Sequence, residues 1–372
     1  MAFWIGLAIF ILASIVAERL LPPQYKKFMP ILVMCVLTFF GLFRYEIGTD
    51  YDWYIVLFDT VKIDDLYPEP TFLLLVEFLH QFHFSYQVMF IAYELPIMLL
   101  LWSGIRYYTK DTEIQILIVA LYYCLQYFFS LNGIRQGLSM VLIFWGYRYC
   151  LERSLWKYLL VVALAASMHY SAVVAAVLYF VPNRVFSWYK YAIVFILTFI
   201  VFKLNIVLAF LSALFGILQV DGRYLNYLSD VDSVKMTGLY MFVQFGLFSI
   251  ARIAIMEMKP QYKGLLNLWF LGILGHFLFS FSLPITRLTK YFEYFIILIM
   301  PYTIQYLNSN FLLQVKDKIY NFKWGYIILL FYMYTFLNMM SGIPQDYYSN
   351  WRNPYPSSMN IEYQFNFKMF DR

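Results

Sequence analysis

The sequence predicts an all-α polytopic membrane protein, and three observations carry this prediction. Of the 372 residues, 62% are hydrophobic and only 13% are charged, and the mean hydropathy is +0.65. Apolar runs such as 159–181 and 326–340 exceed what a soluble core of this length can bury, so lipid must solvate much of this surface. The runs also lack the alternating pattern of an outer-membrane barrel, which leaves helices to satisfy the backbone groups in hydrocarbon.

Apolar segments that are candidate spans follow one another along the chain. They are 3–17, 29–43, 85–104, 114–129, 138–150, 158–182, 190–216, 238–256, 264–283, 291–308 and 325–341. Segment 71–82 carries Glu77 and His80 and is shorter than the ~20 residues that a crossing helix needs. We therefore expect an amphipathic helix on the outer surface there.

Basic residues flank segment 158–182 on both sides: Arg153, Lys157, Arg184 and Lys190. Because positively charged loops stay on the cytoplasmic side, both ends of this segment are expected inside. This predicts a helical hairpin with its tip at residues 167–170. The expected fold class is therefore about ten full spans, one helical hairpin and one outer amphipathic helix.

This topology places most Lys and Arg residues in cytoplasmic loops, and we expect residues 1–372 to form one integral membrane domain. Loop 44–84, loop 217–237 and tail 342–372 lie outside. Many Tyr and Trp residues fall near span ends, where an amphipathic ring suits the headgroup zone. Cytoplasmic anchoring explains the net charge of +5, and the absence of a basic stripe or nucleic-acid motif predicts no nucleic-acid partner. Lys203 and Asn205 indicate either a break within 190–216 or an adjustment at its cytosolic side.

Outer loop 44–84 is the first candidate for substrate contact, because it is densely acidic in an otherwise apolar chain. Its carboxylates are Glu46, Asp50, Asp52, Asp59, Asp64, Asp65, Glu69 and Glu77. Asp50-Tyr51-Asp52 matches the Asp-x-Asp pattern of metal-dependent nucleotide-sugar enzymes. A carboxylate here is equally suited to act as a general base or to accept a sugar hydroxyl. The three cysteines and four histidines have no metal-ligand spacing, so we expect neither a metal nor a cofactor.

Arginines recur at the outer mouths of the spans, where the positive-inside bias disfavours them. They are Arg44, Arg135, Arg223 and Arg287. A guanidinium binds phosphate through two parallel hydrogen bonds and keeps its charge, so converging arginines would suit a diphosphate lipid headgroup. The alternatives are pairing with nearby carboxylates or with ordinary phospholipids.

His169 lies at the expected hairpin tip, followed by Tyr170 and Ser171. A polar group at membrane depth is costly unless it faces a cavity or a partner, which makes His169 a functional candidate. The alternative is a structural histidine that satisfies its own hydrogen bonds.

Several short motifs together resemble the EpsG and Wzy-type exopolysaccharide and O-antigen polymerases. In chain order they are Arg44 with Gly48-Thr49-Asp50-Tyr51, Glu69-Pro70, Asn132-x-x-Arg135-Gln136, Met168-His169-Tyr170-Ser171, Arg287-x-x-x-Tyr291-Phe292 and Asn353-Pro354-Tyr355. Each motif is short, but their order and their placement on the outer face are specific. The resemblance covers most of the chain.

The resemblance implies a membrane glycosyltransferase of the GT-C type in the bacterial inner membrane, with its active site facing the periplasm or cell exterior. Undecaprenyl-diphosphate-linked oligosaccharides would be both donor and acceptor, and a chain-length regulator is a further partner that the family allows. The candidates for the base are His169, Asp50, Asp52 and Glu69, and outer arginines would stabilise the leaving diphosphate. Gln136, Tyr291 and Glu293 are candidate substrate contacts from the same motifs.

Two other functions stay open from the sequence. An O-antigen ligase-like transferase would use the same donor with a different acceptor, and a large late outer loop would favour it. A transporter or flippase of lipid-linked sugars would show paired repeats and ionisable residues at the middle of the membrane, whereas the charges here gather at the outer mouth.

Overall fold

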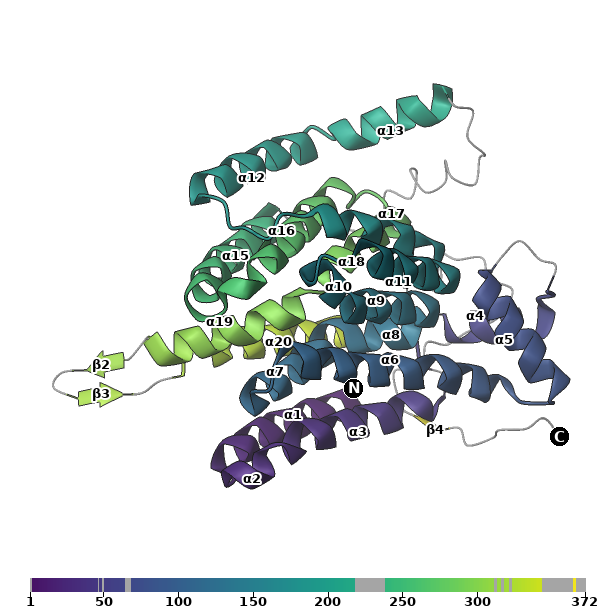
Figure 1. Cartoon of the computed structure of the whole chain (residues 1–372), viewed down its shortest axis with the longest axis horizontal. Helices are drawn as coiled ribbons and strands as arrows, with labels where there is room; N and C mark the ends of the chain where they lie inside the picture. The colour runs from purple at the N-terminus through teal and green to yellow at the C-terminus, as the bar shows by residue number, and fades with distance from the viewer. Residues whose placement is uncertain are drawn as a thin grey trace. The chain divides into compact units, whose positions relative to one another are not determined.

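The computed structural model describes residues 2–45, 47–48, 50–63, 68–217, 238–310, 313–315, 318–320, 323–342 and 364–365. Figure 1 shows the helices and strands along the chain. The chain divides into two compact units. Unit 1 contains residues Met1–Val173 and Leu307–Arg372, and unit 2 contains Val174–Tyr306. Each unit is described separately below.

Unit 1 is a helical bundle with two small two-stranded sheets. Its helices are α1 (Ala2–Leu20), α2 (Pro23–Lys26), α3 (Phe28–Leu42), α4 (Tyr51–Thr60), α5 (Pro70–Gln81), α6 (Tyr86–Tyr108), α7 (Thr112–Tyr122), α8 (Phe128–Asn132), α9 (Ile134–Gly146), α10 (Arg148–Leu151), α11 (Leu155–Met168) and α20 (Tyr326–Gly342). Strand β1 (Arg44–Tyr45) pairs antiparallel with β4 (Gln364–Phe365), and β2 (Leu313–Val315) pairs with β3 (Lys318–Tyr320).

The core of unit 1 lies where α9 packs between α6 and α11, and where α3 and α7 pack beside α1. A π-helical turn, Tyr123–Tyr127, joins α7 to α8. Such turns widen a helix locally and often occur at functional sites. Here Tyr123 and Tyr127 donate their hydroxyls to the carbonyls of Trp4 and Leu37, each at 2.7 Å. The turn therefore binds α7 to α1 and α3.

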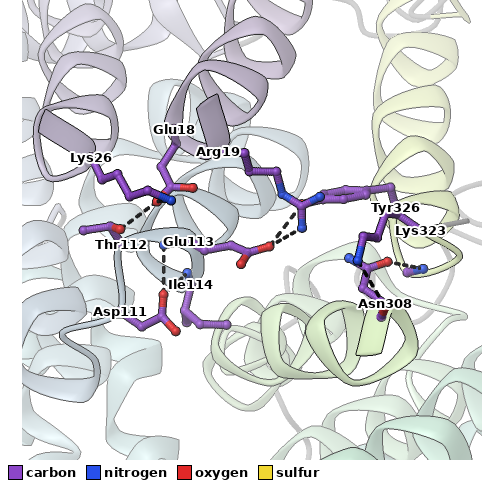
Figure 2. A network of polar contacts seen from close by, with 11 residues as sticks. Glu18, Arg19, Lys26, Asp111, Thr112, Glu113, Ile114, Asn308, Lys323 and Tyr326 are labelled. Atoms are coloured by element: carbon purple, nitrogen blue, oxygen red, sulfur yellow. Dashed lines mark hydrogen bonds and ion pairs between the residues drawn. The ribbon is translucent and has the colours of Figure 1, made fainter. Parts of the chain in front are cut away.

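A polar network connects the end of α1 with the beginnings of α7 and α20 (Figure 2). Thr112 donates to buried Glu18 at 2.7 Å, and Arg19 binds Glu113 while its guanidinium lies 4.7 Å from the centre of the Tyr326 ring. The Asp111 carboxylate caps α7 by accepting the backbone N–H of Glu113 at 2.9 Å. Glu18 of α1 accepts from Thr112 of α7, and Arg19 of α1 contacts both Glu113 of α7 and Tyr326 of α20, so the network connects the three helix ends.

Unit 2 is also helical. It contains α12 (Trp188–Lys203), α13 (Ile206–Ile217), α15 (Gly238–Met258), the short 3₁₀ turn η3 (Pro260–Tyr262), α16 (Lys263–Leu278), α17 (Leu283–Thr286), the 3₁₀ turn η4 (Arg287–Thr289) and α18 (Lys290–Glu293). Helix α19 (Ile296–Asn310) and the 3₁₀ helix η2 (Tyr170–Phe180) each cross the boundary between the units. Helix α16 is the centre of unit 2, because α12, α15 and α18 all pack on it.

The helices establish an all-α membrane protein, but only some are long enough to be spans by themselves. In the described part of the chain, five helices have the length and composition to cross a membrane, and α12 with α13 adds a bent pair. That pair turns by 62° at Asn205, whose φ is 51°, so the break expected near Lys203 and Asn205 is present. Helices α11, α16 and α20 are apolar but shorter.

Two other local predictions coincide with observed elements. Helix α5, Pro70–Gln81, lies where the sequence predicts an amphipathic helix, and its buried residues Phe72, Leu73, Val76 and Leu79 form one face. Helix α11 ends at Met168, His169 is extended, and η2 then runs for 11 residues. The chain therefore breaks at the position expected for the hairpin tip.

Candidate functional site

A buried carboxylate, Glu69, is the centre of the candidate site. Its backbone caps the start of α5, directly before Pro70 at the first helical position. One carboxylate oxygen accepts from Nη1 of Arg135. The other lies 2.6 Å from Nδ1 of His169 and accepts the backbone N–H of Tyr170 at 3.3 Å. We call Glu69, Arg135 and His169 the Glu69 cluster.

Each member of the cluster lies where a helix begins or breaks. Arg135 is the second residue of α9, just after the break at Gly133, and His169 is the extended residue between α11 and η2. Thr71, in the first turn of α5, donates its hydroxyl to the Ser167 carbonyl near the end of α11. The beginning of α5, the break at Gly133 and the break at His169 are far apart in the sequence, and together they bring the three side chains into contact.

Burial differs strongly within the Glu69 cluster. The side chains of Glu69 and Arg135 are 2% and 8% exposed, whereas that of His169 is 25% exposed. The Arg135 guanidinium also lies 5.7 Å from the Tyr54 ring centre and 5.4 Å from that of Phe72, as expected for a cation–π contact. His169 is therefore the member of the cluster that is most accessible to a molecule from outside.

The electrostatics of the cluster keep Glu69 ionised. Burial raises the pKa of a carboxyl, but the hydrogen bond from His169 and the positive charge of Arg135 outweigh burial and hold the pKa of Glu69 below its usual range. An ionised carboxylate only accepts hydrogen bonds, so the proton of this bond resides on Nδ1 of His169. In a neutral imidazole, Nε2 is then an acceptor that can take a proton.

The segment before α4 is attached to the end of α8 through Asn132. The Asn132 side chain accepts the backbone N–H of Asp50 at 2.9 Å. Gly48 has a φ of 105°, and a Cβ there would lie 3.0 Å from Oδ1 of Asn132, so only glycine fits this close approach without strain. In the Asn132-x-x-Arg135-Gln136 motif, Asn132 positions the loop and Arg135 binds Glu69.

Asp50 and Asp52, the predicted Asp-x-Asp pair, lie at the beginning of α4 and are partly exposed. Tyr51 between them is buried and stacks on Phe90 of α6 with ring centres 4.8 Å apart. This stacking anchors the beginning of α4 on α6. Across the described segments, no group of three His, Cys, Asp or Glu side chains is arranged to hold a metal ion.

The outer arginines have different environments. For Arg135, the structure shows one of the alternatives to diphosphate binding, since Arg135 pairs with the carboxylate of Glu69. Arg44 is completely buried 3.9 Å from the equally buried Glu94 and lies over the Phe90 ring at 4.7 Å. A diphosphate could reach it only after the pair separates, so the structure gives no support to that role for Arg44. Arg223 lies outside the described residues, as does the Asn353-Pro354-Tyr355 motif.

A second cluster of charged side chains lies in unit 2. The Glu293 carboxylate is held by Nδ1 of His276 at 2.7 Å, by Lys290 at 2.8 Å and by the Thr289 hydroxyl at 2.7 Å. A Cβ at Gly272 would lie 2.9 Å from the Glu293 backbone nitrogen, so α18 packs directly on α16. His276 positions Glu293 through this contact.

The remaining predicted residues lie near these clusters. Arg287 begins η4 and is partly exposed, whereas Tyr291 is fully buried in unit 2. Gln136 follows Arg135 and is 3% exposed, with its backbone carbonyl accepting the Ser139 hydroxyl at 2.8 Å. Sequence reasoning missed the contacts of Arg135 with Tyr54 and Phe72. The sequence signal closest to these contacts is the Glu69-Pro70 pair. A proline at the first helical position fixes where α5 begins, and α5 carries Phe72.

A sequence model of the EpsG family matches residues 26–353. The chain belongs to the EpsG family. The matched part of this EpsG family member includes both clusters and all the predicted outer arginines. Membership confirms the resemblance read from the motifs and supports a polysaccharide polymerase-type function. No curated protein and no solved structure significantly resembles this EpsG family member.

Proposed function

We propose that the chain is a membrane glycosyltransferase that polymerises a polysaccharide. It moves a growing glycan from undecaprenyl diphosphate onto the non-reducing end of a lipid-linked repeat unit, at the outer face of the bacterial inner membrane. Family membership supports the polymerase class. The observation that carries the mechanism is the 2.6 Å contact between Nδ1 of His169 and Glu69.

In the proposed reaction, His169 is the general base. The acceptor hydroxyl oxygen bonds to the anomeric carbon of the donor sugar, and its proton passes to Nε2 of His169. The bond between that carbon and the diphosphate oxygen breaks, and undecaprenyl diphosphate leaves with the electron pair. Glu69 fixes the imidazole orientation and stabilises the imidazolium that forms, as carboxylates do beside histidine bases in other enzymes.

Arg135 acts through Glu69 in this proposal. Its charge keeps the carboxylate ionised, and an uncompensated carboxylate at this depth would be costly. Binding of the leaving diphosphate by Arg287 and Arg223, and substrate contacts of Asp50, Asp52, Gln136, Tyr291 and Glu293, stay predictions from the sequence. The GT-C architecture with about ten spans is part of the same proposal.

The test is polymer formation by the purified protein in lipid nanodiscs, supplied with lipid-diphosphate repeat units. We expect a ladder of products from the native chain and a loss of at least about 100-fold in initial rate for His169→Gln, the scale of general-base catalysis. Raising the pH should not restore this variant, because its side chain cannot accept the proton.

His83→Asn is the matched control, because His83 is an exposed histidine at the end of loop 44–84. Its φ of 56° is one that asparagine tolerates. Near-native ladders from His169→Gln would exclude His169 as the base. Transfer of a single glycan to a different acceptor would indicate a ligase, and lipid movement across the bilayer without glycosidic bond formation would indicate a flippase.

A further inference from the structure

Unit 2 contains an apolar cavity that is open on one side. It has a volume of about 470 Å³, within the ~300–1,000 Å³ of small-molecule sites. Its walls come from η2 and the segment after it, from α12 and from α16. Helix α12 packs against α16 (Figure 1). We call it the α12/α16 groove.

One end of the groove is basic. Lys190 is part of its lining together with Phe186. The guanidinium of Arg184 lies 4.8 Å from the centre of the Phe186 ring, and Arg252 donates to the Phe186 carbonyl at 3.1 Å. Arg184 and Arg252 therefore both contact Phe186, and Lys190 lines the same groove.

No carboxylate neutralises this end within the described part of unit 2. The acidic residues there are Glu257 and Glu293. Glu257 accepts the Tyr306 hydroxyl at 3.5 Å, and Glu293 is held by His276 and Lys290. The basic end is thus a candidate site for an anion.

The basic end is held in place by Asn267 on α16. Its side-chain oxygen accepts the Tyr191 hydroxyl at 2.6 Å, and its amide nitrogen donates to the carbonyls of Pro182 and Arg184 at 2.7 and 2.8 Å. Because Asn267 is buried and fully engaged, the backbone that carries Arg184 has a defined position beside α12.

The other end of the groove is apolar. Helices α12 and α16 run in the same direction, since Tyr191 meets Asn267 near their starts and the Phe202 ring lies 5.9 Å from that of Phe277 near their ends. Moving along both helices from Lys190 therefore leads to Val194, Leu271 and Leu274. Val177 of η2 completes this end.

We propose that the α12/α16 groove binds an anionic phospholipid, with one acyl chain along Val194 and Leu271 and its phosphate at Lys190. An amphiphile with one negative end matches a groove that is apolar along its length and basic at one end only. The positive-inside reading of the sequence places Lys190 and Arg184 at the cytoplasmic surface, and basic pockets between helices on that side bind anionic headgroups. This site is independent of the proposed glycosyl transfer.

The test measures thermal unfolding of the full-length protein in nanodiscs of phosphatidylcholine alone or with phosphatidylglycerol. Native mass spectrometry of the same samples counts retained lipids. We expect phosphatidylglycerol to raise the unfolding temperature and to remain bound, and we expect Lys190→Gln to lose most of both effects. Lys190 is exposed, so this change leaves the core intact.

Lys203→Gln is the matched control, because Lys203 is an exposed lysine at the opposite end of the same helix. It should keep the full response to phosphatidylglycerol. Leu271→Trp fills the apolar end and should reduce lipid retention without a change in charge. Equal stabilisation by both lipids, or equal responses of Lys190→Gln and Lys203→Gln, would overturn the proposal.

Discussion

At the scale of single residues, two opposing electrostatic effects act on the Glu69 cluster. Burial disfavours the charges of Glu69 and Arg135, and their mutual attraction favours them. A buried ion pair stabilises a protein only when its geometry also satisfies the remaining lone pairs and protons. Glu69 meets this condition, because Arg135, His169 and the Tyr170 backbone all donate to it. The exposed edge of His169 is then the part of the cluster that remains available to a substrate.

The stability of the protein should depend on the ionisation of Glu69. Because its folded pKa lies below the unfolded value of about 4.3, the carboxylate contributes stability above that pH. This contribution is lost as the pH falls through the folded pKa. Denaturant titrations in detergent between pH 7 and pH 3 should show a smaller decline for Glu69→Gln than for the native chain.

The same variant should be destabilised at pH 7. Removing one member of a buried ion pair costs roughly 3–5 kcal/mol, because the partner charge stays behind. Glu77→Gln is the control, since Glu77 is an exposed carboxylate on the same helix. Parallel pH profiles for the native chain and Glu69→Gln would show that Glu69 is not the titrating group.

At the scale of elements, breaks in helices position the functional side chains. The extended residue between α11 and η2 presents His169, and the break at Gly133 separates Asn132 from Arg135. In a membrane, non-helical backbone is tolerated where protein or a water-filled cavity surrounds it.

Replacing Gly48 tests whether the first loop must pack on Asn132. Gly48→Ala should displace the loop, because the left-handed conformation costs roughly 1–3 kcal/mol for other residues and the new methyl would approach Asn132. We expect reduced polymer synthesis and faster proteolysis of loop 44–84. Gly133→Ala is the control, because its φ is −93° and its nearest neighbour would lie at 3.6 Å. Equal effects of both changes would argue against the loop contact.

At the scale of the whole molecule, helix length limits what can be assigned to the membrane. Five helices and one bent pair qualify as spans among the described residues, whereas α9, α11 and α16 are shorter than a bilayer requires. Helix α6 has 23 residues and is ~35 Å long, which is enough to cross the hydrocarbon core. Its two ends are therefore predicted to lie on opposite sides of the membrane.

Cysteine labelling across α6 tests the predicted topology. Helix α4 packs near the start of α6 through Tyr51 and Phe90, while Lys110 follows its end. In a background with the exposed Cys35 replaced by Ala, Thr60→Cys should react with an impermeant maleimide in intact cells. Lys110→Cys should react only after the inner face is opened. The reverse pattern would invert the topology and move the Glu69 cluster to the cytoplasmic side.

The sequence by itself determined the helical membrane class, the start of α5 at Glu69-Pro70, the break at His169 and the break near Lys203 and Asn205. It also determined the family, through short motifs in a defined order. These features follow from local composition, since hydrophobic runs, proline and polar interruptions act within a few residues of themselves.

Only the tertiary structure decided which side chains meet. Glu69, Arg135 and His169 are each unremarkable in their own segment, and the burial of Arg44 against Glu94 has no local signature. Tyr123 and Tyr127 are buried and bind carbonyls of other helices, which nothing in their own segment indicates. The physical reason is that a partner for a polar group is selected by how helices pack, and packing depends on contacts between residues distant in the chain.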